Sequence, residues 1–200
     1  YMEVKNQYKD CILFYRLGDF YEMFFDDALT ASKVLEITLT GRDCGQPERA
    51  PMCGVPYHAC DVYLNKLIEN GFKVAICEQV EDPKLAKGIV KREVIRVVTP
   101  GTNMSNAILD ETRNNYLMSI FENDGAFGIS LVDITTGEFK TARVPSLSKL
   151  TDEINKYSPA EIIGNHSFMN CDLDFVYLRE KMKISISEAP EHYFNQMLCE

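Results

Sequence analysis

A carboxylate lies among aromatic side chains in residues 17–24 (LGDFYEMF), directly after a Gly-Asp pair that is typical of a turn. If the segment is extended, Phe20 and Glu22 lie on one face, and Tyr21 and Met23 lie on the other. An unpaired Glu22 inside a core would cost several kcal/mol. We therefore expect the start of this face to be open to solvent or to a ligand. From these residues alone, the alternative that Phe20 caps the core also stays open.

Other sequence patterns that carry chemistry are absent. The sequence has no G-x-x-x-x-G-K-[ST], no G-x-G-x-x-G and no G-x-S-x-G. Its seven Cys residues are irregularly spaced without a C-x-x-C, and its three His residues are far apart. This pattern argues against a disulfide framework and a zinc module, and it indicates a reducing, cytoplasmic environment. We expect no catalytic residue and no metal site in this chain.

The net charge of −9 argues against nucleic acid when the chain is taken as a whole. Residues 1–104 are nearly balanced, with 13 Lys and Arg against 15 Asp and Glu, whereas residues 105–200 have 8 against 15. Residues 84–96 hold five basic side chains and one acid. They form either a solvated loop with an edge strand or a ridge that contacts phosphates. The basic residues are Lys84, Lys87, Lys91, Arg92 and Arg96.

The elements that would position these residues form a mixed α/β unit in the first half of the chain. Continuous apolar runs of β-type residues predict strands. The clearest helix begins near residue 57, where apolar side chains recur at helical spacing along one face. We expect strands at 11–17, 20–25, 37–41, 73–80 and 90–99, helices at 1–9, 26–36 and 57–70, and a Gly- and Pro-rich loop at 42–56.

The second half has a different pattern, which follows a polar linker at 105–114. Short gaps containing Gly separate three strand-like runs, as in an antiparallel meander. We expect strands at 115–122, 126–134, 137–144, 160–163 and 173–177, with helices at 146–157 and 188–199. This order is compatible with an RNase H-like α/β layer. The chain opens on Tyr1 and stops without a closing signal, so we expect a fragment whose second unit is cut short.

Two alternatives for this second half remain. Asp133, Glu138 and Asp152 could form a two-metal nuclease cluster, although the strand 115–122 carries no central carboxylate. The acidic half could instead be a module that docks a protein partner. No stretch approaches the ~18 to 20 apolar residues of a membrane span, so we expect no membrane association.

Four blocks follow one another in the first half: FYRLGDFYEMFFDDA (14–28), PMCGVPYHA (51–59), VAICEQ (74–79) and RVVTPGT (96–102). In this order they resemble the MutS DNA mismatch-repair family, and the first block is similar to its mismatch-recognition segment. The remainder resembles the connector domain of the family by pattern and position. The resemblance implies a mismatch-recognition domain at 1–104 and a connector domain at 115–200.

The resemblance also implies roles for individual residues. Phe20 would be a wedge inserted from the minor groove, and Glu22 would hydrogen-bond a base beside it. Leu17 and Met52 would lie against the groove, and the basic residues at 84–96 would contact the DNA backbone. For the full-length protein it implies a homodimer that binds ATP with magnesium, acts as a DNA-dependent ATPase and signals to a MutL-type partner. We expect the ATPase outside this chain.

Overall fold

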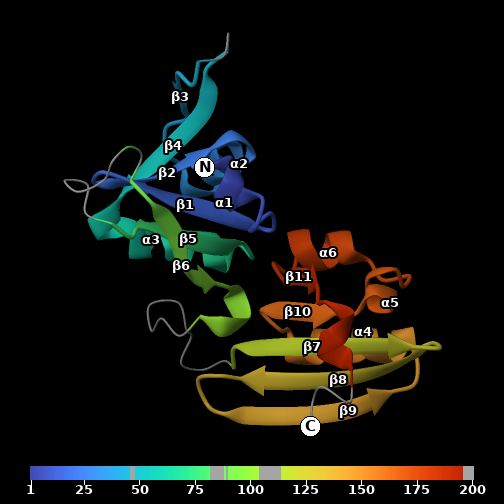
Figure 1. Cartoon of the computed structure of the whole chain (residues 1–200). Coiled ribbons are helices and arrows are strands. Elements are labelled where there is room, and N and C mark those ends of the chain that lie inside the picture. Colours follow the sequence, from blue (N-terminus) through green and yellow to red (C-terminus); the bar gives the residue numbers. More distant parts are fainter. Residues whose placement is uncertain (46–47, 82–87, 89, 104–113, 196–200) are drawn as a thin grey trace. The chain divides into compact units, whose positions relative to one another are not determined.

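The computed structural model describes residues 1–45, 48–81, 88, 90–103 and 114–195 (Figure 1). The chain divides into two compact units, Tyr1–Thr99 and Pro100–Glu200. Each unit is built on one mixed sheet with helices packed against it, which confirms the predicted α/β class.

The sheet of the first unit has six strands in the order β3-β4-β2-β1-β5-β6. β1 and β5 are parallel, and the other neighbours are antiparallel. The strands are β1 (Cys11–Leu17), β2 (Phe20–Phe24), β3 (Thr40–Arg42), β4 (Ala50–Pro56), β5 (Lys73–Gln79) and β6 (Arg92–Val98).

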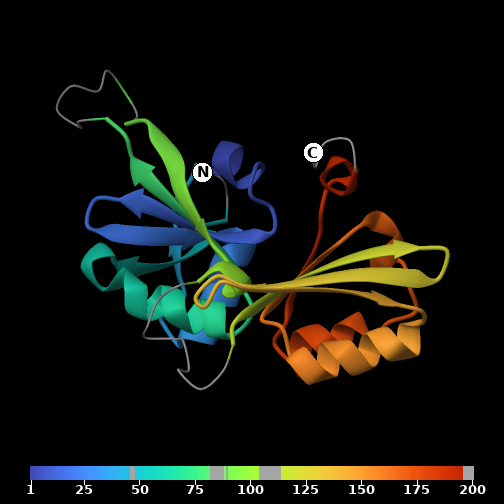
Figure 2. The same ribbon diagram turned by 90° about the horizontal axis from the view of Figure 1, so that it is seen from below.

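Helices cover the two faces of this sheet unequally. The larger core lies on the face covered by α2 and α3, where Phe14, Met23 and Leu67 are fully buried. The opposite face carries a small cluster around Leu13, against which Val4 of α1 and its neighbours Tyr1 and Tyr8 pack. Figure 2 shows α3 on one side of the sheet and α1 on the other. The helices of this unit are α1 (Met2–Lys5), α2 (Phe25–Leu35), the 3-10 turn η1 (Tyr57–Ala59) and α3 (Cys60–Glu69).

β2 passes into α2 without a loop, because Phe24 ends the strand and Phe25 begins the helix. Phe25 makes this change of direction with a positive φ of 53°, which is unusual for a bulky residue. β2 and α2 thus follow one another without an intervening residue.

Asp27 ties the start of α2 to the N-terminus and to β1. Its carboxylate is buried and forms an ion pair of 2.8 Å with Lys5 Nζ. The backbone N–H of Leu13 and the hydroxyl of Tyr1 also donate to Asp27, at 3.0 and 2.7 Å. Burial and the negative charge of Asp27 raise the pKa of Tyr1, so that hydroxyl keeps its proton as a donor. These partners offset the cost of burying the carboxylate.

The second unit has a five-stranded sheet in the order β11-β10-β7-β8-β9. β7, β8 and β9 form the predicted antiparallel meander, and β10 runs parallel to both β7 and β11. The elements are η2 (Pro100–Thr102), β7 (Tyr116–Asn123), β8 (Ala126–Asp133), β9 (Glu138–Val144), α4 (Leu147–Tyr157), β10 (Glu161–Gly164), α5 (His166–Met169), α6 (Phe175–Glu180), β11 (Ser185–Glu188) and η3 (Glu191–Phe194).

The core of this unit lies between the sheet and its helices. Leu150 and Ile154 of α4, Phe168 of α5 and Leu178 of α6 are buried against the strands. The opposite face of the β7–β8–β9 meander is partly exposed, since Phe121 and Phe139 on it remain accessible. Within the described ranges, no helix is long and apolar enough to cross a bilayer.

Several predicted elements were wrong. Residues 42–56 are not only loop, because β4 occupies the second half of that range. Pro51 and Pro56 lie near the two ends of β4, where a missing N–H removes few ladder hydrogen bonds. The helix expected at 1–9 is confined to Met2–Lys5.

The end of the chain is also different from the prediction. Residues 173–177 are not a strand, because Asp174 caps α6 by accepting a 2.8 Å hydrogen bond from the Tyr177 N–H. The helix expected at 188–199 is absent from its described part, where β11 ends at Glu188 and η3 follows Pro190. Glu188 is paired in β11, and Pro190, which has no backbone N–H to donate, precedes only a short 3-10 turn.

Candidate functional site

Phe20 stands at the start of β2 with 46% of its surface exposed. It lies directly opposite Leu17 in the β1–β2 hairpin, and the turn between them contains Gly18 at a φ of 59°. That backbone conformation suits glycine. The open start of this face is therefore confirmed, and Phe20 does not cap the core.

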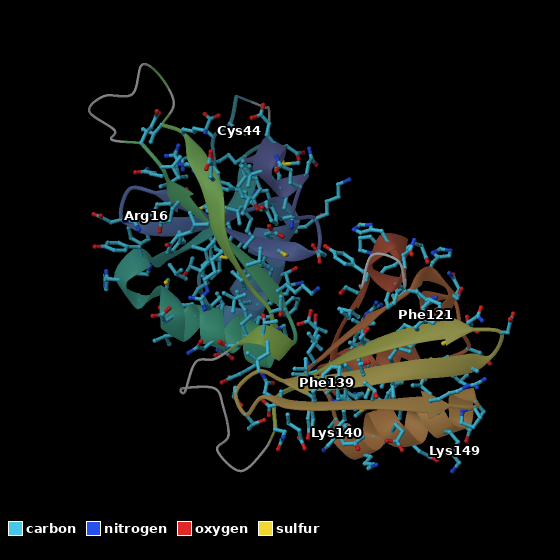
Figure 3. All side chains as sticks on the ribbon, turned by 60° about the horizontal axis from the view of Figure 1, so that its bottom comes forward. Arg16, Cys44, Phe121, Phe139, Lys140 and Lys149 are labelled. Atoms are coloured by element: carbon cyan, nitrogen blue, oxygen red, sulfur yellow. The ribbon has the colours of Figure 1, made fainter. Side chains whose placement is uncertain are left out.

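The turn that presents Phe20 is held by two hydrogen bonds from outside it. The backbone N–H of Tyr57 donates to the Asp19 carbonyl at 2.9 Å. Arg16, labelled in Figure 3, donates through Nε to the Gly18 carbonyl at 2.5 Å. Arg16 also pairs with Glu78 at 3.5 Å, and Glu78 accepts a hydrogen bond from the Tyr21 hydroxyl. Arg16 of β1 and Tyr57 of η1 thus hold the backbone of the two residues that precede the exposed ring.

Strand register places Leu17, Phe20, Glu22 and Met52 on one face of β1, β2 and β4. Leu17 lies opposite Phe20, and Met52 lies opposite Phe24, which shares a face with Glu22. Leu17, Glu22 and Met52 are each half-buried, so the face is partly open along its length. The structure therefore brings together the four residues that the sequence analysis associated with base contacts.

Glu22 is not alone on this face. Its Oε2 atom lies 2.5 Å from an amino nitrogen of Arg42, on β3. The Arg42 side chain is 48% exposed, and the Glu22 side chain is 17% exposed. Gly54 lies directly opposite Glu22 on β4, so no side chain stands between the carboxylate and the neighbouring strand. Sequence reasoning missed Arg42, because β4, the strand that joins β3 to β2, was expected to be loop.

A groove of about 650 Å³ adjoins these residues within the first unit. It is largely apolar, and Leu17, Phe24 and Arg42 form part of its wall. The face that carries Phe20 and Glu22 is therefore continuous with a concave surface. The remaining wall is formed by Tyr1, Met2, Glu3, Tyr15, Phe25, Asp43, Cys44 and Ala50.

Of the basic residues at 84–96, the three that the structure describes have different surroundings. Lys84 and Lys87 lie outside the described residues. Lys91 forms an ion pair with Glu93, whose hydrogen bond and charge raise the pKa of Lys91.

The two arginines of this group differ in their contacts. Arg92 donates to the backbone carbonyls of Arg16 and Val90, both at 2.7 Å, and its guanidinium lies over the Tyr15 ring. Arg92 is thus engaged in holding its own sheet. Arg96 is exposed on β6, an edge strand, and is the better placed of the two for a phosphate.

The acids of the second unit have structural partners. Asp133 is fully buried, and its Oδ1 accepts hydrogen bonds from the Thr135 hydroxyl and N–H at 2.6 and 2.9 Å. Its Oδ2 accepts from the Asn115 N–H at 3.1 Å. Glu138 pairs with Lys140 at 2.8 Å, and the exposed Asp152 pairs with Lys149 at 3.1 Å.

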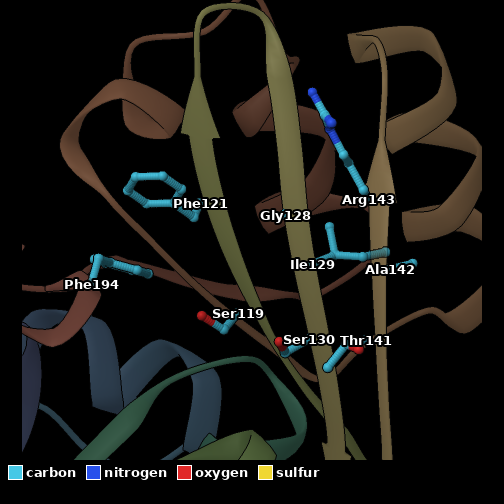
Figure 4. Close-up of a pocket in the computed structure, with 9 residues that line it drawn as sticks. All are labelled: Ser119, Phe121, Gly128, Ile129, Ser130, Thr141, Ala142, Arg143 and Phe194. Carbon is cyan, nitrogen blue, oxygen red and sulfur yellow. The ribbon is translucent and has the colours of Figure 1, made fainter. Parts of the chain in front are cut away.

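The open face of the β7–β8–β9 meander carries a hollow of about 410 Å³ (Figure 4). Phe121 and Phe194, with ring centres 5.5 Å apart, lie at one side of it and Arg143 lies at the other. No carboxylate lines the hollow. Among the residues that the structure describes, no group of three or more His, Cys, Asp or Glu could hold a metal ion. The nuclease alternative therefore gains no support.

The chain is a protein of two mixed α/β units, the first of which presents an aromatic ring and a carboxylate on an open sheet face. Residues 1–107 match the family model described as MutS domain I, and residues 115–194 match MutS domain II. The chain belongs to the MutS family of DNA mismatch-repair proteins.

Individual relatives agree with the family assignment. The chain is 64% identical over 195 residues to the DNA mismatch repair protein MutS of Lachnoclostridium phytofermentans, a match that covers 98% of this chain and 21% of that protein. It is 62% identical over 198 residues to the protein of the same name from Ruminiclostridium cellulolyticum, covering 97% of this chain and 23% of that protein. The chain thus spans about a fifth of the length of the curated relatives it matches.

Proposed function

We propose that this chain recognises mispaired or bulged bases in duplex DNA. In this proposal Phe20 enters from the minor groove as a wedge and stacks on the mispaired base, while Glu22 accepts a hydrogen bond from a base nitrogen. Leu17 and Met52 lie against the groove, and Arg96 contacts the backbone. The observation that carries the proposal is the exposed Phe20 ring beside the half-buried Glu22 carboxylate on one open sheet face.

Deformability of the DNA is the physical basis of the selectivity. An apolar ring that enters the minor groove unstacks a base step and kinks the duplex. Unstacking costs a few kcal/mol, and it costs less where pairing is already defective. Glu22 adds a second criterion for selecting the duplex. Phosphates repel its carboxylate, and a hydrogen bond donated by a base N–H offsets this repulsion. The fixed backbone around Gly18 supports this role by keeping the ring in position before DNA arrives.

The remaining activities of the family lie outside this chain in our proposal. The sequence holds no phosphate-binding G-x-x-x-x-G-K-[ST] loop. We assign ATP, magnesium and ATPase activity to other parts of the full-length protein, together with homodimer and MutL-type contacts. The chain itself then binds mismatched DNA without catalysing a reaction. We also propose a cytoplasmic location.

A fluorescence titration of the full-length protein with matched and mismatched duplexes tests the proposal. We expect Phe20→Ala to fold but to lose about tenfold or more of its preference for the mismatch, because stacking on an aromatic ring contributes about 1–3 kcal/mol per base. Phe139→Ala removes another exposed phenylalanine, 66% accessible on β9, and should leave the preference unchanged. Equal binding by Phe20→Ala and wild type would refute the wedge and favour a protein-interaction module.

A further inference from the structure

We propose that Arg42 positions the Glu22 carboxylate and thereby determines how strongly Glu22 discriminates between mismatched and intact duplex. This inference rests on the proposed function, because it concerns the carboxylate that would meet the base. Its basis is the 2.5 Å ion pair between Arg42 and Glu22 on the face that carries Phe20.

The sheet register directs Arg42 to this carboxylate. Arg42 lies opposite Ala50 on β4, and Ala50 shares a face with Met52 and Gly54. Gly54 in turn lies opposite Glu22 on β2. Arg42 and Glu22 are therefore on the same face but on strands separated by β4, so the arginine must reach across β4. The bare backbone at Gly54 leaves room for this contact.

The pair uses one oxygen of the carboxylate and leaves the other available. Arg42 binds Oε2, and no described residue donates a hydrogen bond to Oε1. A carboxylate can accept several hydrogen bonds at its two oxygens. Arg42 can thus hold Glu22 from one side while a base N–H binds from the other, so the pair need not break when DNA binds.

The difference in exposure assigns the roles within the pair. Glu22 is the inner member with 17% of its side chain accessible, and Arg42 is the outer member with 48%. The Arg42 guanidinium also lies over the Phe24 ring, 5.9 Å from its centre, and this cation–π contact favours the same position.

A simpler role would make Arg42 only a cation that contacts the DNA backbone. A backbone contact positions DNA without reading its sequence or pairing. Loss of such a contact would weaken binding to matched and mismatched duplex alike, whether or not Glu22 is present. The positioning role predicts that loss of Arg42 changes the ratio of mismatched to matched affinity and that this change depends on Glu22. The backbone role predicts neither.

A double-mutant cycle in the full-length protein separates these roles, with the mismatched-to-matched affinity ratio as the readout. We expect Arg42→Ala to lower the ratio about fivefold in the wild-type background, and less than about twofold when Glu22 is already replaced by Gln. Arg42→Lys keeps the charge without the planar guanidinium and should give an intermediate ratio. Arg49→Ala is the matched control, because Arg49 is exposed close by in the sequence and should leave the ratio unchanged.

Melting temperatures of all variants establish that each protein is folded. An unchanged ratio in Arg42→Ala, or an equal loss with and without Glu22, would overturn the positioning role. If Phe20→Ala loses the preference in the same titrations, such a result overturns only this inference. If Phe20→Ala retains the preference, the proposed function itself is wrong.

Discussion

The guanidinium carbon of Arg16 lies 3.8 Å from the centre of the Tyr57 ring. This cation–π contact joins the end of β1 to the turn η1, and both flank the turn that presents Phe20. Tyr57 is itself 44% exposed, so the contact lies at the surface beside the candidate wedge. Arg16 thus combines a stacked contact with its hydrogen bond to Gly18.

Replacing Arg16 tests whether this contact holds Phe20 in position. We expect Arg16→Ala to remain folded, to lose about 1 kcal/mol of stability and to show a weaker preference for mismatched duplex. Amide hydrogen exchange at Gly18 and Phe20 should become faster, because the Gly18 carbonyl loses its partner. Arg16→Lys keeps the charge and serves as the control. Unchanged exchange at these amides in Arg16→Ala would show that Arg16 does not hold the turn.

Glu22→Ala should relax discrimination more than affinity. The substitution removes a carboxylate that repels phosphates, and it also releases Arg42 from its ion pair. We therefore expect tighter binding to intact duplex and a smaller mismatched-to-matched ratio in a fluorescence titration with paired oligonucleotides. A uniform fall in affinity for both duplexes would contradict the repulsion.

Asp27 is expected to be essential for the stability of the first unit. Asp27→Ala would leave the Lys5 ammonium and the Leu13 N–H without their partner, at a cost of about 3 kcal/mol. Urea unfolding of the chain measures this loss. Asp26→Ala changes the neighbouring exposed carboxylate and should cost less than about 0.5 kcal/mol. Similar urea concentrations at the unfolding midpoints of the two variants would contradict the structural role of Asp27.

The second unit should lose stability in acid partly through Asp133. Burial raises the pKa of Asp133, but hydrogen bonds from Thr135, Asn115 and Thr136 outweigh it and lower the pKa below its usual 3.8. A lowered folded-state pKa stabilises the fold above about pH 4, and this contribution disappears as the pH falls through the folded value.

The corresponding experiment is urea unfolding at about pH 7 and pH 3. Asp133→Asn should be less stable than wild type at neutral pH by about 1–3 kcal/mol and should lose less stability on acidification. Asp152→Asn, which changes an exposed carboxylate of α4, should follow wild type at both values. If Asp133→Asn and wild type lose equal stability in acid, Asp133 does not contribute to the pH dependence.

Sequence alone predicted the parts of the fold in which local pattern and tertiary pairing agree. β1, β2 and the β7–β8–β9 meander are runs of β-type residues bounded by Gly turns, and the structure has strands there. β4 was missed because Pro51 and Gly54 are typical of loops, whereas its pairing with β2 and β3 stabilises it as a strand. The short apolar run before Leu178 was assigned to a strand, because five residues are too few to distinguish the two periodicities.

The candidate site was predicted only in part for the same reason. Alternation along β2 was enough to expect Phe20 and Glu22 on a common open face. Arg42 carries no local signal, because it reaches Glu22 only through the strand that the sequence analysis assigned to a loop. The contact between Arg16 and Tyr57 likewise depends on tertiary packing between residues 41 positions apart in the chain.

The direct passage from β2 into α2 has a mechanical consequence. Within residues 20–35, all of which the structure describes, no loop separates the strand that carries Phe20 from the helix that follows. A force applied to the ring by stacked base pairs would therefore be transmitted to the first turn of α2. That turn is connected through Asp27 to Lys5 and Tyr1, so under the proposed function these two side chains would help the sheet resist displacement of Phe20 by the DNA.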